Sequence, residues 1–406
     1  MKPRIGTLLI LSYFLLSVCF PFFMMLEGNY YLRLNFNGII ITNFIFIIIG
    51  LFLLKPNWHI ENFEKGLLAL TMLVFINLLV HGIYKEEWLN FSYLLSITLI
   101  LIIFKNIEFS KSVLRLDLYV PLIFSLLVLI HLLLAFRHGY GKLGFTNDCF
   151  INPGHFSGFV IIFCPLFLSI SYFKKANTKL GSIVKIICSI TCALAFFIVV
   201  FNNTRTGWIG AIIISNIYHL IWQLRKNPDG RISLPTKING ILQMGFIVFL
   251  FGFAAYLSKR ESAEGRLLIW RLSATIIKDN PLTGVGFNRF EAVYNLYQSD
   301  YFKTHNDPKS AWLADNVLVA YNDFLHFTVE LGLFFLLPIF YLLAEIVKKF
   351  SWILKTDLKD ISIKNASFIG LATIVFLQMF FSYPLSIIEI TNAIFLNFLY
   401  VTMTDE

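Results

Sequence analysis

Residues 182–201 read SIVKIICSITCALAFFIVVF and carry one charged side chain, Lys185. A helix of about 20 apolar residues is long enough to cross the hydrocarbon core of a bilayer. Stretches of this kind recur along the chain, which is 57% hydrophobic and only 14% charged. Soluble domains carry roughly a quarter charged residues, so the composition argues against a large soluble helical protein. We therefore predict an all-α polytopic membrane protein.

About twelve stretches are apolar and long enough to be transmembrane helices. They lie at 6–26, 34–54, 66–84, 89–104, 116–136, 156–173, 182–201, 207–224, 239–257, 324–347, 365–383 and 386–402. The first resembles a signal peptide, but its apolar run is long and Pro21 makes a poor cleavage site, so we expect a retained helix. Cys188 and Cys192 share one helix face without a nearby histidine or acid, so we expect core residues rather than metal ligands.

The distribution of basic residues sets the orientation and explains the net charge of +9. With the N-terminus inside, the inner segments hold 20 of the 33 basic residues, and the short outer segments hold five. Membrane proteins keep lysine and arginine on the cytoplasmic side, so both termini are expected in the cytoplasm. Because topology accounts for the charge, we expect no nucleic-acid partner.

One external loop, residues 258–323, departs from this pattern because it is long and holds the other eight basic residues. It divides the chain into helices 1–9 (1–257), the loop (258–323), and helices 10–12 with a cytoplasmic tail (324–406). Long loops of this kind are usually functional, so we expect the chemistry here.

Two amphipathic helices are predicted inside the loop. Residues 264–279 place apolar side chains at helical spacing, and Asn280-Pro281 ends that helix. A second helix carries an aromatic stripe. The stripe consists of Phe287, Phe290, Tyr294, Tyr297 and Tyr301. We expect both helices to lie with their apolar sides in the membrane interface and to roof a cavity.

Two polar segments near the outer face hold further candidates. Arg205 follows Asn203 and Thr204 in a short turn between two spans. It is either a helix-end arginine that reaches water or a phosphate-binding group, because its planar fork makes paired hydrogen bonds. His155 lies in a glycine-rich and polar segment, and it is either a structural histidine or part of an ordered entrance.

Four motifs together resemble a known superfamily. They are Thr204-Arg205-Thr-Gly-Trp208, Gly265-Arg266-x-x-x-Trp270 with Pro281-Leu-x-Gly-x-Gly286, Tyr321-Asn322-Asp-Phe-Leu325 with Glu330-Leu-Gly332, and Asn152-Pro-Gly-His155-x-x-Gly158. Their order and side resemble the superfamily of O-antigen ligases, O-antigen polymerases and protein O-oligosaccharyltransferases, over roughly residues 145–335.

The resemblance implies a GT-C-like fold in the bacterial inner membrane, with the active site facing the periplasm. It also implies transfer of a glycan en bloc from undecaprenyl diphosphate to an acceptor. The favoured acceptor is lipid A core, and a growing glycan or a protein is the alternative. The resemblance implies no metal or other cofactor. The expected partners are therefore the lipid-linked glycan, the acceptor and membrane lipid.

The resemblance also assigns residues. Arg205 and Arg266 match the arginines that bind the diphosphate, and Tyr321 and Asn322 match the catalytic segment. Five neighbouring residues are predicted to bind substrate. These are Trp270, Arg271, His155, Asp323 and His326.

Tyr321 departs from the family pattern, which has a catalytic histidine at this position. A phenol is a poor base at neutral pH because its ordinary pKa is near 10. Other groups that could take the role are Asp323, Asp315, His305 and Asp307, and His326 lies about 140° further around a helix. The remaining possibilities are transfer that relies on leaving-group stabilisation, or an inactive member.

Two other classes of function stay open from the sequence. A transporter or flippase with twelve helices would carry its site near the bilayer midplane, often between two similar halves. No repeat is seen between the halves here, and the spans are almost free of charge. A structural assembly subunit is the third possibility.

Overall fold

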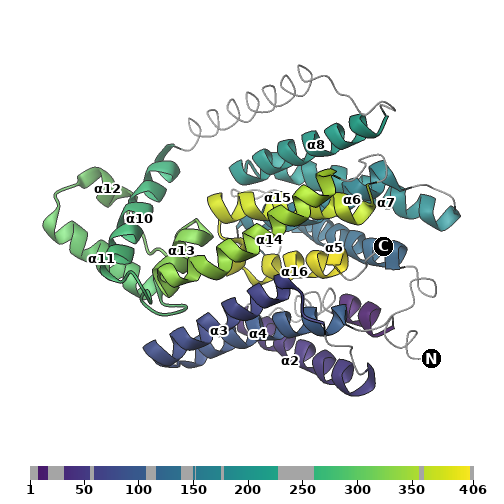
Figure 1. The fold of residues 1–406 in the computed structure, drawn as a ribbon. Coiled ribbons are helices and arrows are strands. Elements are labelled where there is room, and N and C mark those ends of the chain that lie inside the picture. Colours follow the sequence, from purple (N-terminus) through teal and green to yellow (C-terminus); the bar gives the residue numbers. More distant parts are fainter. Residues whose placement is uncertain are drawn as a thin grey trace.

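The computed structural model describes residues 8–16, 32–54, 59–106, 116–138, 150, 152–174, 178–226, 260–355 and 361–402. The predicted span 239–257 and most of the first one, 6–26, lie outside these residues. The described parts form helices joined by turns, and no strand occurs among them (Figure 1). The prediction of an all-helical fold is confirmed.

The helices follow one another along the described chain. Their bounds are α2 Leu32–Ile49, α3 Asn62–His81, α4 Lys85–Lys105, α5 Leu116–His138, α6 Pro153–Phe173, α7 Lys179–Phe201, α8 Arg205–Lys226, α10 Arg260–Asp279, α11 Phe290–Thr304, α12 Pro308–Leu313, α13 Asp323–Leu331, α14 Leu336–Lys355, α15 Ile363–Phe381 and α16 Ile388–Thr402. A π-helical turn at Gly50–Leu54 follows α2, and 3₁₀ turns precede α14 and α16.

Within the described residues, six helices are long and apolar enough to cross a membrane. They are α3, α4, α5 between Leu118 and Arg137, α6, α7 and α15. Two shorter apolar helices span Gly38–Phe52 and Ile388–Thr402. The apolar helices identify a membrane protein. The count of twelve spans remains a prediction.

Helix α6 forms the centre of the bundle, where α5, α7, α8, α15 and α16 pack around it. The hydroxyl of Tyr218 on α8 lies 2.7 Å from the carbonyl oxygen of Pro165 and 2.8 Å from that of Ala366. This buried contact joins α6, α8 and α15. Cys188 and Cys192 are buried, unbridged core residues, as predicted.

The loop helices form a small core of their own, which corrects the interfacial prediction. Helices α10 and α11 exist near the predicted ranges, and Figure 1 shows them with α12 at one end of the bundle. Phe290 and Tyr294 of the aromatic stripe are buried against Leu268, Leu272 and Ile276 of α10. The stripe packs inward because each helix offers the other an apolar face, which removes both faces from water.

The span predicted at 324–347 is not one helix, which is a second correction. Helix α13 ends at Gly332, whose φ of 72° lies in the left-handed region, and α14 begins only at Leu336. The chain breaks here because Leu333 N donates to Pro281 O at 2.8 Å, a contact that an unbroken helix would prevent.

Two further backbone hydrogen bonds extend this contact into what we call the interlock, residues 281–286 against 329–333. Val285 N donates to Val329 O at 3.0 Å, and Gly286 N donates to Glu330 O at 2.9 Å. A Cβ atom at Gly332 would lie 2.1 Å from Leu282 O, and one at Gly284 would lie 2.4 Å from Glu330 O. The glycines of the two motifs are therefore required by the close approach of two backbones.

Candidate functional site

Arg266 lies on α10 between the loop and the helix bundle. Its Nη1 donates to the carbonyl oxygen of Phe381 at 2.9 Å, at the end of α15. Its guanidinium carbon lies 4.9 Å from the centre of the Tyr321 ring, which is within the range of a cation–π contact. No ion pair joins Arg266 to a carboxylate among the described residues. The Phe381 carbonyl and the Tyr321 ring therefore position the guanidinium, and no described carboxylate neutralises its positive charge.

Two more aromatic side chains extend this contact. The Tyr321 ring meets the Tyr383 ring edge to face, with centres 5.1 Å apart. The Tyr383 hydroxyl forms a hydrogen bond with Nε2 of His155, in the first turn of α6. We call Arg266, Tyr321, Tyr383 and His155 the arginine–tyrosine cluster. It joins residues from α6, α10, the start of α13 and the turn after α15, so only the folded chain brings them together.

Arg205 is the first residue of α8 and acts electrostatically on Arg266. Burial lowers the pKa of the Arg266 guanidinium, the Tyr321 phenol opposes this effect, and the charge of Arg205 lowers that pKa further. The turn that holds Arg205 is fixed by Trp208, whose indole donates to Val199 O at 3.0 Å. Two cations thus lie near each other at one end of the bundle, which favours an anion with more than one negative charge.

The backbone is strained at the cluster. Tyr321 has a φ of 54°, and Asn203, two residues before Arg205, has a φ of 50°. A bulky residue such as tyrosine rarely adopts this left-handed conformation, which costs of order 1–3 kcal/mol. Strain of this kind concentrates at functional sites, and here Tyr321 lies within one of the four motifs, whereas Asn203 immediately precedes another.

The side chains of Asn322 and Asp323 form hydrogen bonds with the backbone rather than with the side chains of the cluster. The Asn322 side chain caps α13 by accepting from Leu325 N at 3.0 Å. Asp323 is fully buried, its Oδ2 accepts from Leu385 N at 3.0 Å, and burial raises the pKa of its carboxyl well above the usual range. This hydrogen bond joins the start of α13 to the turn of Tyr383, and so holds Tyr321 and Tyr383 together.

Trp270 and Arg271 do not enter the cluster. The Trp270 indole donates to Ala320 O at 2.9 Å and packs against the small core of the loop, so it positions the chain just before Tyr321. Arg271 is exposed, and its charge reaches Asp307 at the N-terminus of α12. Asp307 itself caps that helix by accepting from Ser310 N at 3.0 Å.

The remaining candidate bases also lie elsewhere. His305 stacks on Tyr301 with ring centres 4.4 Å apart, and the Asp315 carboxylate accepts from Asn316 N at 2.7 Å. His326 is buried against Phe290, and burial lowers its pKa to about 3. His305 and Asp315 belong to the loop and His326 to α13, and none of the three contacts the cluster through a described hydrogen bond.

Glu330 is a buried helix cap. Its Oε1 accepts from Phe290 N at 3.1 Å, and Nε2 of His326 lies 3.5 Å from the same oxygen. Burial raises the pKa of the Glu330 carboxyl to about 7, although hydrogen bonds from the backbone of 288–290 oppose the rise. The glutamate thus satisfies amide groups that the start of α11 would otherwise leave unpaired.

The sequence did not indicate several residues that form contacts at the cluster and the interlock. Tyr383 is the last residue of the predicted span 365–383, where no motif indicates a functional role. Asn77 of α3 donates from Nδ2 to Thr283 O at 2.7 Å and accepts from Phe287 N at 2.9 Å. Arg289 pairs with Glu87 at 2.8 Å. A buried amide within the span of α3 was the available signal, because polar side chains in spans need partners.

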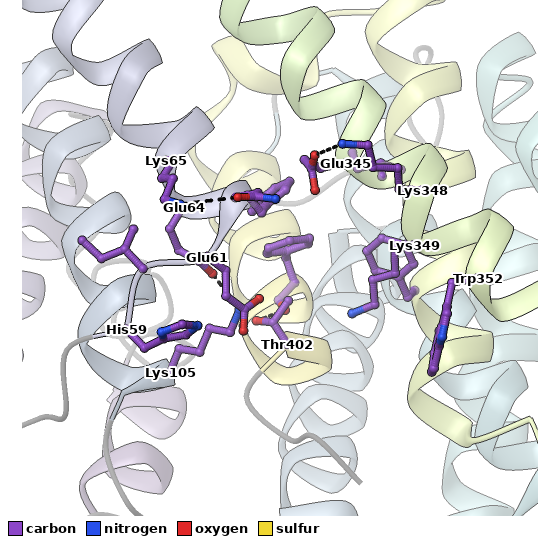
Figure 2. A pocket seen from close by; sticks show the side chains of 16 residues that line it. His59, Glu61, Glu64, Lys65, Lys105, Glu345, Lys348, Lys349, Trp352 and Thr402 are labelled. Atoms are coloured by element: carbon purple, nitrogen blue, oxygen red, sulfur yellow. Dashed lines mark hydrogen bonds and ion pairs between the residues drawn. The ribbon is translucent and has the colours of Figure 1, made fainter.

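A cavity of about 650 Å³ lies where the first residues of α3 meet the last residues of α4 and α16 and the middle of α14 (Figure 2), and none of the four residues of the cluster lines it. Its charged lining is largely paired, since Lys105 contacts Glu61 at 2.5 Å and Glu64 at 2.9 Å, and Lys348 contacts Glu345 at 2.5 Å. In the part of the chain that the structure describes, no three His, Cys, Asp or Glu side chains are grouped as metal ligands.

Comparison with known proteins supports the superfamily seen in the motifs. The family model described as O-Antigen ligase matches residues 190–340. The match begins within α7 and ends within α14, so it includes Arg205, both arms of the interlock and Tyr321. No curated protein matches the chain. The match confirms the resemblance to the O-antigen ligase superfamily.

Proposed function

Given that residues 190–340 match the O-antigen ligase family, we propose that this chain is a membrane glycosyltransferase that transfers a glycan en bloc from undecaprenyl diphosphate to an acceptor. The observation that carries the proposal is Arg266, held by Phe381 O and the Tyr321 ring within the electrostatic reach of Arg205. Lipid A core is the favoured acceptor. A growing glycan and a protein are the alternatives.

The two arginines supply the main catalytic effect in this proposal. Negative charge develops on the diphosphate as its bond to the sugar breaks. Prepositioned cations stabilise this charge more strongly in a partly buried site than in water. A guanidinium also offers two parallel N–H groups to phosphate oxygens. Arg205 and Arg266 are therefore assigned to the leaving group.

The proposed topology follows the distribution of basic residues. The chain spans the bacterial inner membrane about twelve times, with both termini in the cytoplasm and residues 258–323 in the periplasm. Because the chain breaks at Gly332, α13 is grouped with the loop and α14 provides the crossing. The cluster then lies at the periplasmic surface, where lipid-linked glycans and lipid A core are accessible.

Deletion of the gene in its own host, followed by electrophoresis of envelope glycans, tests the proposal. Loss of all long chains from lipid A indicates a ligase, chains of a single repeat indicate a polymerase, and loss of glycoprotein staining indicates a protein transferase. An envelope with unchanged glycans would contradict the proposed function.

A further inference from the structure

We propose that Tyr383 and His155 form the proton-accepting pair of this site, in place of the histidine that the related proteins carry at the position of Tyr321. The inference rests on the proposed function, and it assigns the base that the Tyr321 position lacks.

The pair is defined by one hydrogen bond between distant segments. The Tyr383 hydroxyl bonds to Nε2 of His155, and the two rings meet edge to face with centres 5.0 Å apart. Both side chains are half-buried, so each is fixed by its surroundings and still reached from the surface. A phenol bonded to an imidazole can pass its proton on, which a phenol alone cannot do readily at neutral pH.

The pair lies beside the groups assigned to the leaving group. The Tyr321 ring touches Tyr383 on one side, at 5.1 Å, and the Arg266 guanidinium on the other, at 4.9 Å. The Tyr321 ring therefore lies between the Tyr383 ring and Arg266, the cation that is assigned to the diphosphate. This contact explains how the chain retains a site although the family's histidine is absent.

The position of the Tyr383 turn is itself fixed. Asp323 accepts from Leu385 N at 3.0 Å, and Arg266 donates to Phe381 O at 2.9 Å. The two bonds hold the turn two residues before and two residues after Tyr383. A base must be kept within hydrogen-bond reach of the proton that it removes, and this double attachment provides the necessary rigidity.

Other acids and bases near the site are already committed. Asp323 is fully buried and bonded to the backbone, and His326 is buried in the core of the loop. His305 and Asp307 are occupied at the far end of α11, where one stacks on Tyr301 and the other caps α12. Among the described candidates, His155 is the imidazole that connects to the cluster.

The proton and electron balance is simple. The acceptor hydroxyl gives its proton to the Tyr383 oxygen while Tyr383 passes its own proton to Nε2 of His155. The acceptor oxygen forms the bond to the anomeric carbon, and the bond from that carbon to the diphosphate breaks. The electron pair of the broken bond leaves with the diphosphate, beside Arg205 and Arg266. Tyr383 ends neutral, and His155 holds the proton as an imidazolium only during the step, because burial lowers the pKa of His155 to about 4 and the proton then passes to water at neutral pH.

The test measures the rate of glycan transfer in membrane vesicles from the deletion strain, which contain the endogenous lipid-linked glycan and its acceptor. Tyr383→Phe keeps the ring but removes the hydroxyl, and His155→Gln keeps polar atoms but removes the imidazole. We expect each to lower the rate by about 100-fold at unchanged protein level, the usual size of general-base catalysis. His219→Gln, at an exposed histidine of α8, is the matched control and should stay at the wild-type rate.

A second substitution separates catalysis from structural support. Tyr321→His in the His155→Gln background places an imidazole at the family's position, where histidine tolerates a φ of 54° better than tyrosine does. We expect it to recover at least about tenfold, whereas Tyr321→Phe in the same background should recover nothing.

The outcomes separate the two proposals. Wild-type transfer in Tyr383→Phe or His155→Gln overturns the proton-accepting pair and leaves the proposed function intact. Loss of transfer without recovery by Tyr321→His overturns it as well, because the pair would then have only a structural role. Unchanged glycans in the deletion strain remove the proposed function and this inference together.

Discussion

The two ends of α13 derive from one short segment, Tyr321 to Gly332, yet they differ in every physical respect. At the first end, Tyr321 is half-buried, strained and in contact with a cation. At the other end, Glu330 and Gly332 are enclosed, and the polar groups of Glu330 and the N–H of Leu333 are bonded to the segment 281–290. The difference shows that residues of one motif can have different roles within three turns of helix: some take part in the reaction, and others hold the backbone in place.

The largest expected effect is the loss of glycan transfer when either arginine of the proposed diphosphate site is removed. Arg266→Ala and Arg205→Ala should each lower transfer by at least about 100-fold, the cost of removing one group that stabilises developing charge. Protein levels should not change, because neither side chain belongs to the hydrophobic core. Arg271→Ala on the same helix is the control, and the exposed position predicts a change below about twofold. Wild-type transfer in both variants would remove the diphosphate site.

Gly332→Ala tests the structural role of the second end of α13, where the interlock forms. The added Cβ would lie 2.1 Å from Leu282 O, and the φ of 72° adds strain. We expect a loss of more than about 2 kcal/mol in the free energy of unfolding, seen as a lower thermal midpoint and faster proteolysis of the loop. Gly265→Ala is the control, since its Cβ has room and alanine favours a helix. Equal stability of the two variants would show that the interlock is dispensable.

Glu330→Gln sharpens the comparison through pH. The unfolded carboxyl ionises near its ordinary pKa of 4.5, whereas burial raises the folded pKa to about 7. Ionisation therefore favours the unfolded chain as pH rises from about 4.5 to about 7, and the effect is constant above that range. Relative to Glu330→Gln, the wild type should gain stability as pH falls from 7 to 5.

The neighbouring histidine makes the comparison of variants necessary. Burial lowers the pKa of His326 to about 3, so the unfolded chain binds a proton first as pH falls through its ordinary value of 6.5. This effect destabilises the fold on acidification and opposes that of Glu330. Because His326 Nε2 lies 3.5 Å from Glu330 Oε1, the substitution also changes this effect, and the difference between the two proteins reports Glu330 together with its contact to His326. Thermal midpoints in detergent at several pH values measure that difference, and a difference independent of pH would contradict the assigned pKa of Glu330.

Trp270→Phe should have the smallest effect. It removes the hydrogen bond from the indole to Ala320 O and keeps an aromatic ring in the loop core. The expected cost is about 1 kcal/mol of stability, with little change in the apparent affinity for the lipid-linked donor. A large rise in the donor KM would instead place Trp270 on the substrate, as the sequence had suggested.

Sequence periodicity predicted the helices well, because apolar runs and amphipathic spacing reflect burial along one element. Helices α7 and α10 appear close to their expected ranges. The motifs also indicated Arg266 and Tyr321, which do meet in the structure. That their partner is Tyr383 could not be predicted, because the contact joins segments over sixty residues apart through packing that no local pattern records.

The errors have a common physical origin. The aromatic stripe and the stretch 324–347 were each interpreted one element at a time, so their apolar faces were assigned to lipid. In the structure Phe290 and Tyr294 are buried by α10, and the stretch is divided by backbone bonds to Pro281, Val285 and Gly286. His326 was assigned to substrate for the same reason, since its sequence neighbours are functional while its spatial neighbours form a core.

The interlock also divides the loop into parts that can be exchanged and parts that cannot. Because it fastens residue 286 beside residue 330, the chain between them leaves and returns at one fixed point. A graft of this segment from a relative has to keep the two backbone arms and the cap by Glu330. It also has to keep Tyr321, whose ring contacts Arg266, and Asp323, which accepts from Leu385 N. Chimeric proteins that swap only residues 291–319 would therefore vary most of α11 and all of α12 while they leave Arg205, Arg266 and Tyr321 unchanged.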